Sequence, residues 1–269
     1  MRPLPLLVAL SFVLAACGQG QPAERLVITG SSTIAPLIAE IGKRYEAQHP
    51  GVRIDVQTGG SSRGIADARS GLAHIGMASR ALLPQEQAGL RTHRLADDGV
   101  CFLVHRDNPV AALTDAQLRD IYTGRIRNWK DVGGKDAPIT VINRADGRSE
   151  LELFSAYFDV RPEQIRADLI VGDNQQGIKT LAGNPDAIVY MSVGASEYDA
   201  ARGVPIKLLP LDGVAASAEA VAAGRFPMSR PLLLITSIDP SPAAQAFIAY
   251  AQSPDVHDLI RAQSFVPLR

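Results

Sequence analysis

Three short stretches rich in glycine and serine have the composition of an anion-binding site. They are residues 30–33, 59–64 and 78–80. Each follows an apolar run typical of a strand, and the first two precede a stretch with helical spacing. The first amides of a helix have no partner inside the helix, and the helix dipole adds partial positive charge there. Serine and threonine hydroxyls add neutral donors, so these stretches favour the binding of an anion.

A fourth stretch, residues 143–149, adds two guanidinium groups, Arg144 and Arg148. Arginine binds tetrahedral oxyanions through paired hydrogen bonds. Taken singly, a serine before a helix is most often a helix cap, and an arginine is most often a solvated charge. Four such stretches at the carboxyl ends of predicted strands favour a ligand site over these local roles, because ligands of open α/β sheets bind at that end.

Signals for enzyme chemistry are weak. The chain has neither a Gly-x-Ser-x-Gly elbow nor a Walker loop, and its five histidines lack close metal-ligand spacing. The pair Asp97 and Asp98 is expected in a solvated turn, whereas His74 and Trp129 are expected to pack. The sequence therefore predicts no enzyme activity, no metal and no cofactor.

Composition excludes further classes of function. The 269 residues carry a formal net charge of −1 and only 5% aromatic residues, which gives neither a basic surface nor stacking platforms for nucleic acid. No uncharged apolar run reaches the roughly 20 residues that a membrane-spanning helix needs. Two cysteines allow at most one disulfide, and Cys101, inside an apolar run, is expected to be a buried thiol.

Strands and helices alternate in the first part of the chain. Strand patterns cover residues 26–28, 52–56 and 74–78, and helical spacing covers residues 33–48 and 63–70. Strand, polar turn, helix and strand in this order indicate an α/β sheet.

A second region begins near residue 107. Capping boxes at Thr114 with Gln117 and at Ser149 with Glu152 predict two helix starts. Helices are expected over residues 115–122, 150–158 and 243–262, and strands over residues 139–142, 187–191 and 231–236.

The expected fold class is α/β with two lobes, each a mixed sheet flanked by helices. The first lobe comprises residues 24–106 and 205–269, with residues 206–211 running back to it, and the second comprises residues 107–204. Two chain crossings would form a hinge, with a cleft between the lobes.

The first residues have the pattern of a secretory signal. Arg2 precedes a short apolar run that ends in Leu14-Ala15-Ala16 before Cys17. This end resembles the lipobox of bacterial lipoproteins, in which the chain is cut before the cysteine and the thiol carries lipid. We expect a signal peptide over residues 1–16, lipid on Cys17 and a flexible tether over residues 17–23.

A series of short motifs runs through the predicted mature chain. They lie at residues 29–33 (TGSST), 59–65 (GGSSRGI), 75–80 (IGMASR), 121–129 (IYTGRIRNW), 143–144 (NR), 226–232 (FPMSRPL) and 265–268 (FVPL). Their order and spacing resemble those of the phosphate-binding proteins of bacterial ABC importers, a family of the periplasmic binding-protein class. The resemblance extends over residues 26–268 and implies the two-lobed fold.

The resemblance also implies which residues hold the ligand. It places pocket donors at Thr33, at the amide of Ile34, at Ser61 and at Arg144. Together with the polar stretches above, the candidate ligand-binding residues are Ser32, Thr33, Ile34, Ser61, Ser62, Ser79, Arg80, Arg144, Gly147, Arg148 and Ser149.

Two positions depart from the family pattern. Arg80 stands where many members have an aspartate that accepts the proton of hydrogen phosphate and so helps to exclude sulfate. Glu150 stands where a threonine donor is usual. Glu150 either supplies the missing acceptor or is a surface residue that the helix dipole favours, and we favour the second interpretation.

The leading hypothesis is a lipid-anchored, extracytoplasmic binding protein of the bacterial envelope that captures phosphate or a related oxyanion for ABC-type import. Its expected partners are the oxyanion, an ABC permease and the membrane through Cys17, without nucleic acid and as a monomer. One alternative is a surface sensor or adhesion module that kept the fold without transport. Another is a phosphate-ester hydrolase with Ser61 as nucleophile, which lacks a credible base.

If Cys17 carries lipid, Cys17→Ser will abolish the partitioning of the protein into detergent and membranes. The measurement is detergent phase separation of cells that express the parent or the variant. Partitioning that survives in Cys17→Ser would contradict the lipoprotein hypothesis.

Overall fold

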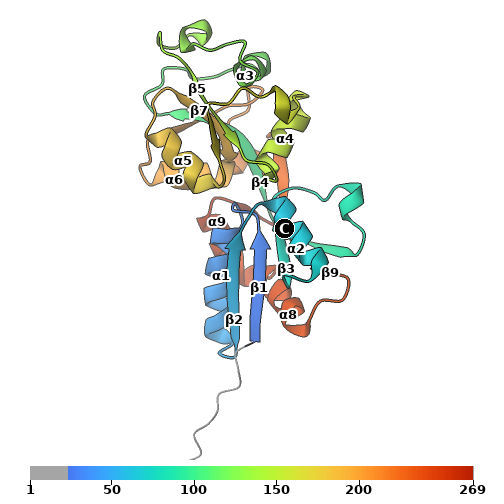
Figure 1. Ribbon diagram of the computed structural model, residues 1–269. Helices are drawn as coiled ribbons and strands as arrows, with labels where there is room; N and C mark the ends of the chain where they lie inside the picture. Colours follow the sequence, from blue (N-terminus) through green and yellow to red (C-terminus); the bar gives the residue numbers. More distant parts are fainter. Residues whose placement is uncertain (1–23, 269) are drawn as a thin grey trace, which may run out of the picture.

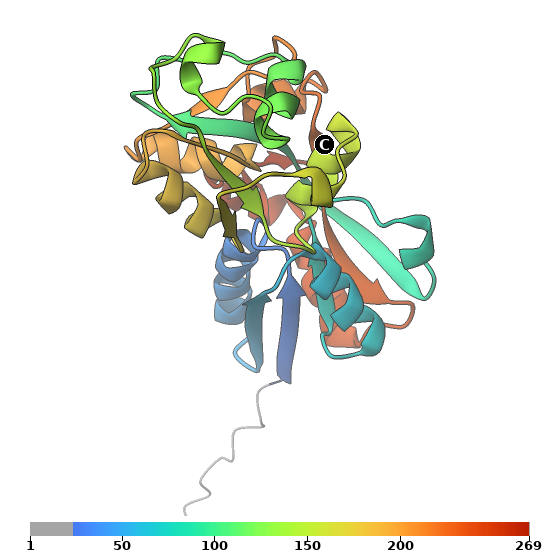
Figure 2. The ribbon, with the colours of Figure 1, turned by 45° about the horizontal axis from the view of Figure 1, so that its top comes forward.

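The long strand β4 (Leu90–His105) joins two lobes of the protein. The computed structural model describes residues 24–268, so the predicted signal peptide, Cys17 and the tether lie outside the described residues. Figure 1 shows one lobe below and the other above, with β4 labelled where they meet. The two lobes remain distinct in the turned view of Figure 2.

The first lobe is built on a mixed sheet. Its parallel strands are β1 (Glu24–Gly30), β2 (Val52–Thr58) and β3 (Ile75–Ala78), and β9 (Ser229–Ser237) is antiparallel to β3. Its helices are α1 (Ala35–Gln48), α2 (Ser61–Ser70), α8 (Pro242–Ala251) and α9 (His257–Ala262). The short strand β10 (Val266–Pro267) pairs with β4, and the 3-10 turns η1 (Pro84–Glu86) and η4 (Pro254–Val256) complete the lobe.

The second lobe is built around the far half of β4. Its other strands are β5 (Thr140–Arg144), β6 (Leu169–Val171), β7 (Ala187–Ser192) and β8 (Ile206–Leu209). Its helices are α3 (Asp115–Tyr122), α4 (Ser149–Phe158), α5 (Asn174–Ala182), α6 (Val193–Ala201) and α7 (Ala218–Ala222), with 3-10 turns η2 (Trp129–Val132) and η3 (Pro162–Gln164).

β4 belongs to both lobes because its two halves pair with different strands. Residues 90–99 pair with β9, and residues 100–105 pair with β7 and β8, in the strand order β2-β1-β3-β9-β4-β7-β5-β6. The ladder between β4 and β9 ends at the pair Gly99–Ser229. The two passages of chain between the lobes therefore lie side by side.

Each lobe has its own apolar core. The first contains Ile28, Ile38 and Phe247. The second is centred on Phe102, whose ring meets the rings of four aromatic residues edge to face, with centroids 5.7 to 6.2 Å apart. These four are Tyr122, Phe154, Phe158 and Tyr190. Two separate cores are what allows the lobes to act as units.

The predicted α/β class is confirmed, and most predicted elements are present. The capping box of α3 forms as expected, since the Thr114 hydroxyl accepts a hydrogen bond from the Gln117 amide at 3.2 Å. Trp129 is buried and donates to the Asp186 carbonyl. Cys101 is also buried, and this burial raises the pKa of its thiol. Among residues 24–268, no helix combines the length and apolarity needed to cross a membrane.

The segment over residues 206–211 does not run back to the first lobe as expected. Its first four residues form β8, which pairs with residues 102–105 of β4, and Ile206 and Leu209 pack in the second core. An apolar run predicts a strand but does not specify the strand with which it pairs. The proposed lobe boundaries at 106/107 and 204/205 stay a prediction.

Two further local predictions are wrong. The helix expected over residues 243–262 is interrupted, because α8 ends at Ala251 and Pro254 opens a 3-10 turn before α9. His74 is exposed rather than packed, and its Nδ1 atom accepts a hydrogen bond from the backbone amide of Val27.

Because Phe102 is the centre of the second core, Phe102→Ala will lower the free energy of unfolding by about 3–5 kcal/mol. Leu72, which is 73% exposed, is the control, and Leu72→Ala will change the free energy by less than about 0.5 kcal/mol. Urea unfolding of both variants is the measurement. Equal effects would show that the aromatic cluster does not hold the lobe together.

Candidate functional site

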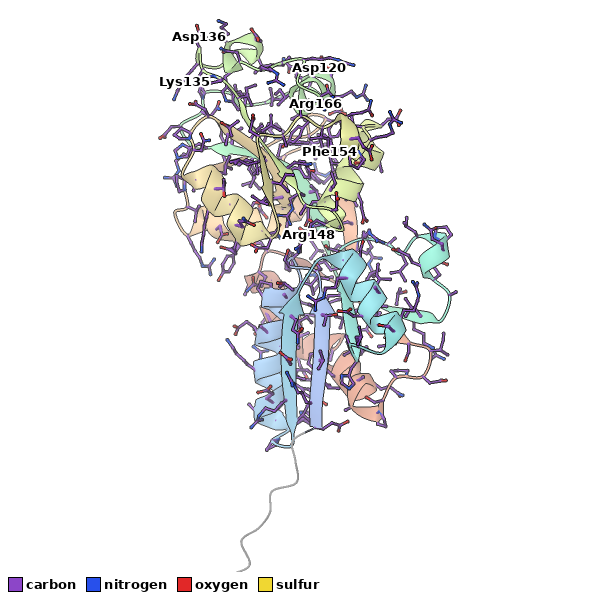
Figure 3. The ribbon with its side chains drawn as sticks, in the orientation of Figure 1. Asp120, Lys135, Asp136, Arg148, Phe154 and Arg166 are labelled. Atoms are coloured by element: carbon purple, nitrogen blue, oxygen red, sulfur yellow. The ribbon has the colours of Figure 1, made fainter. Side chains whose placement is uncertain are left out.

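The predicted polar stretches meet where the two lobes touch. In the first lobe they follow β1, β2 and β3, and in the second lobe they lead from β5 into α4. Figure 3 shows Arg148, the residue before α4, on the side of the second lobe that faces the first. At Gly60 the backbone has φ 97°, and a Cβ atom there would lie only 2.6 Å from the Gly147 carbonyl oxygen. The lobes approach each other too closely at this point for any residue but glycine.

Four serines form a hydrogen-bonded chain across the interface between the lobes. The Ser79 hydroxyl lies 2.9 Å from that of Ser31 and 2.7 Å from that of Ser149, and the Ser79 amide donates to the Ser61 hydroxyl at 3.1 Å. All four side chains are buried. The structure therefore brings the predicted residues Ser61, Ser79 and Ser149 together and adds Ser31, which the sequence did not single out.

Thr33 contacts the second lobe through its hydroxyl. The hydroxyl donates to Glu150 Oε1 at 3.0 Å and accepts from Asn174 Nδ2 at 3.0 Å and from Arg230 Nη2 at 3.2 Å. Two accepted bonds direct the single proton of Thr33 toward the carboxylate. Asn174 and Arg230 were missed by the sequence analysis. No local signal marks Asn174, but an arginine inside an apolar strand is one that marks Arg230.

Glu150 is buried, and the preferred interpretation of a surface residue is wrong. Its carboxylate accepts from Thr33, from Arg230 Nη1 at 3.0 Å and from Arg144 Nη2 at 3.4 Å, and its side chain is 3% exposed. Burial alone would raise the pKa of Glu150, but the charges of Arg230 and Arg144 outweigh burial and hold this pKa well below its ordinary value. Glu150 is therefore an ionised carboxylate enclosed between the lobes.

Arg230 is paired with a second buried carboxylate, that of Asp98. The two residues face each other in the β4–β9 ladder, with Nη2 to Oδ2 at 2.9 Å, and both side chains are 1% exposed. The prediction of a solvated turn for Asp97 and Asp98 is wrong, because both lie in β4 and only Asp97 reaches the surface, where it pairs with Arg94. Burial would lower the pKa of Arg230, and Glu150 and Asp98 raise it above its ordinary value.

Arg144 and Arg148 retain hydrogen-bonding capacity. Arg144 is 1% exposed, and its Nε atom has no hydrogen-bond partner among residues 24–268. The same holds for Nε and Nη1 of Arg148, whose pKa is lowered by burial and by the charge of Arg144. The three arginines 144, 148 and 230 face the two carboxylates of Asp98 and Glu150, which leaves one positive charge in excess.

Arg80 lies in a separate ion cluster beside this site. Its guanidinium binds Glu86 at 2.6 Å and also contacts Glu152 of α4, while the Ser62 hydroxyl donates to Glu152 at 3.1 Å. The predicted capping box of Ser149 and Glu152 is therefore wrong, because α4 has no side-chain cap and both residues bind the first lobe instead. Arg80 and Ser62 contribute to contact between the lobes through Glu152.

The remaining predicted residues lie at the edge of the site. The Ile34 side chain is fully buried in the first core, which leaves only its amide at the start of α1 for a ligand. Ser32 lines a pocket of about 270 Å³ between the lobes, together with Thr33 and Asn174. Gly147 presents its carbonyl to the Ser62 amide at 3.4 Å.

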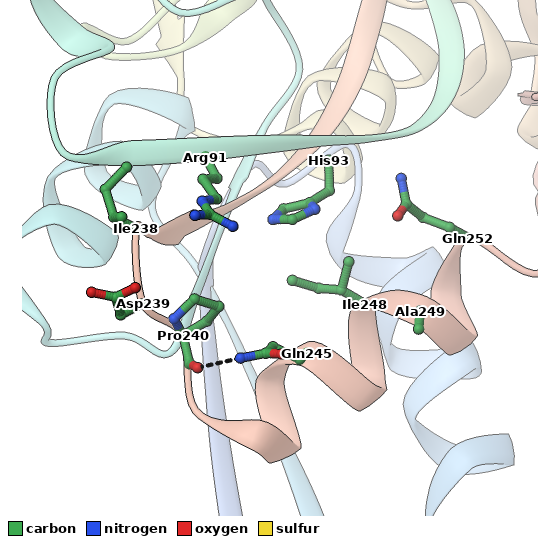
Figure 4. Close-up of a pocket in the computed structure, with 9 residues that line it drawn as sticks. All are labelled: Arg91, His93, Ile238, Asp239, Pro240, Gln245, Ile248, Ala249 and Gln252. Atoms are coloured by element: carbon green, nitrogen blue, oxygen red, sulfur yellow. Dashed lines mark hydrogen bonds between the residues drawn. The ribbon is translucent and has the colours of Figure 1, made fainter.

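A larger hollow of about 350 Å³ lies elsewhere, against α8 of the first lobe. Figure 4 shows Arg91 and His93 of β4 on one side of it and Gln245 and Ile248 of α8 on the other. Its lining mixes one exposed arginine with an aspartate and apolar side chains, and it contains none of the predicted site residues. The interlobe cluster is therefore the better candidate for an anion site.

Comparison with known proteins agrees with this arrangement. The family profile described as "PBP superfamily domain" matches residues 16–255. The chain belongs to the PBP superfamily. It is 28% identical to the phosphate-binding protein PstS of Bacillus subtilis over 285 residues, which cover 98% of this chain and 92% of the relative.

Solved structures of the PBP superfamily match over nearly the whole described chain. A phosphate ABC transporter substrate-binding protein from Clostridium perfringens, solved with bound phosphate, has a TM-score of 0.85 and 31% identity, covering 91% of this chain and all of that one. An ABC-type phosphate transport receptor from Vibrio cholerae has a TM-score of 0.74 and 29% identity, covering 90% of this chain and all of that one.

Asp98→Asn will destabilise the protein by about 3–5 kcal/mol, because it removes one of the two carboxylates that compensate the buried Arg230. The matched control is the neighbouring Asp97→Asn, which breaks a partly exposed pair and will cost at most about 1 kcal/mol. Chemical unfolding of the two variants measures the difference. A loss in Asp98→Asn no larger than in Asp97→Asn would show that Arg230 does not depend on Asp98.

Proposed function

We propose that this protein is a solute-binding protein that captures phosphate between its lobes and delivers it to an ABC permease for import. The observation that carries the proposal is the buried cluster of arginines and hydroxyls contributed by both lobes. The phosphate-binding relatives, matched over nearly their whole length, support the choice of phosphate among oxyanions.

Capture requires donors and lobe closure but no covalent chemistry, so the proposed activity is binding and not catalysis. The candidate donors are Arg144 Nε, Arg148 Nε and Nη1, and the backbone amides that begin α1, α2 and α4. They come from both lobes, so an anion that contacts them all stabilises the closed form over an open one. Only such a differential affinity allows a ligand to shift the lobes toward closure.

The proposal includes a place for the protein in the cell. A lipid on Cys17 would hold the mature chain on the extracytoplasmic side of a bacterial membrane, with residues 17–23 as the tether. This position would keep a monomeric binding protein close to its permease. The pattern of the first 17 residues supports this part of the proposal.

Arg144→Ala will weaken phosphate binding by about two orders of magnitude or more, since removing one partner of a buried charge pair costs about 2–5 kcal/mol. Isothermal titration with phosphate is the measurement, and Arg53→Ala, at an exposed position of β2, is the control with unchanged affinity. Because Arg144 also compensates Glu150, thermal unfolding must confirm that the variant is folded. A folded Arg144→Ala variant with parental affinity would remove Arg144 from the site.

A further inference from the structure

The carboxylate of Glu150 already occupies donors that a tetrahedral oxyanion in this cluster would seek. Thr33 and Arg230 donate to one of its oxygens, and Arg144 donates to the other. These donors come from the loop after β1, from β9 and from β5. A ligand that binds Arg144 and Arg148 therefore lies against an anion that belongs to the protein itself.

Glu150 is fixed in this position. Swinging its side chain out would leave Arg230 with Asp98 as its only carboxylate and Arg144 with none, and uncompensated buried charges are strongly unfavourable. The charged groups that face it are Arg144 of β5, Arg230 of β9 and Arg148 before α4, with Asp98 of β4 behind Arg230. Three cations and one distant carboxylate keep Glu150 ionised at neutral pH.

We propose that Glu150 restricts the site to tetrahedral oxyanions that carry a proton, because a ligand oxygen facing its carboxylate must donate a hydrogen bond. This inference rests on the proposed function and names the class of ligand within it. Two unprotonated oxygens at this point would repel each other in a site with little water to screen them. An O–H donor facing a carboxylate gives instead a short, charge-assisted hydrogen bond.

The proton requirement separates phosphate from sulfate. Hydrogen phosphate brings a proton of its own at neutral pH, whereas sulfate has none. Sulfate can bind beside Glu150 only when one proton is taken from solution and placed between the carboxylate and the ligand oxygen. Its affinity must then rise by about tenfold for each pH unit of acidification, as linkage to one proton requires.

The test is isothermal titration of the parent protein with phosphate and with sulfate between about pH 8 and about pH 6. We expect phosphate to bind throughout, and sulfate to bind about a hundredfold more tightly at the lower pH than at the higher. In Glu150→Gln the amide donates to an unprotonated oxygen, so sulfate will bind with less than about a twofold change over the same range.

Glu152→Gln is the matched control, since Glu152 lies in the same helix and also bridges the lobes but contacts Arg80 and Ser62 instead. It will keep the pH dependence of sulfate binding even if overall affinity falls. If Glu150→Gln does not fold, Glu150→Thr replaces it, and the pH profile of the parent decides the matter by itself.

The outcomes separate this inference from the proposed function. Phosphate that fails to bind the parent protein would overturn the proposed function. Phosphate that binds together with sulfate of pH-independent affinity would overturn only the role of Glu150. A pH-dependent parent and an equally pH-dependent Glu150→Gln would also overturn it, because another group would then supply the proton.

Discussion

The buried guanidinium of Arg230 is the interaction on which the arrangement of the two lobes depends. It lies on β9, one of the two strands that pass between the lobes, and binds Asp98 on the other, Glu150 of α4 and the Thr33 hydroxyl. Moving a guanidinium out of water is costly, and the cost is offset only when every partner is in place. Because Thr33 belongs to the first lobe and Glu150 to the second, satisfying Arg230 requires the lobes to be in contact.

Features that depend on neighbours in sequence were predictable. Glycine, serine and apolar periodicity are read over a few residues, so the order of strands and helices and the turn before α4 followed from the sequence alone. The loops after β1, β2 and β3 were also placed correctly at one end of the sheet, because parallel strands joined by helices bring their carboxyl ends to the same edge. Resemblance to a family then identified Arg144.

Features that depend on distant partners were not predictable. Arg230 meets Asp98 across 132 positions of sequence and Thr33 across 197. The spacing of Ser149 and Glu152 fits a capping box equally well, but partners in the first lobe hold both side chains in the structure. Glu150 shows the same limit, because a carboxylate in the first turn of a helix satisfies the dipole whether it is exposed or buried.

The network also determines which donors remain for a ligand. Asn174 and Arg230 both donate to the Thr33 hydroxyl, so its one proton is directed to Glu150. Thr33 therefore orients the carboxylate, and it becomes a ligand donor only if that bond is exchanged. The unpaired Nε of Arg144 and the unpaired Nε and Nη1 of Arg148 need no such exchange. Since both arginines flank the start of α4, its amides and these guanidinium groups favour an anion at the same place, directly beside Glu150.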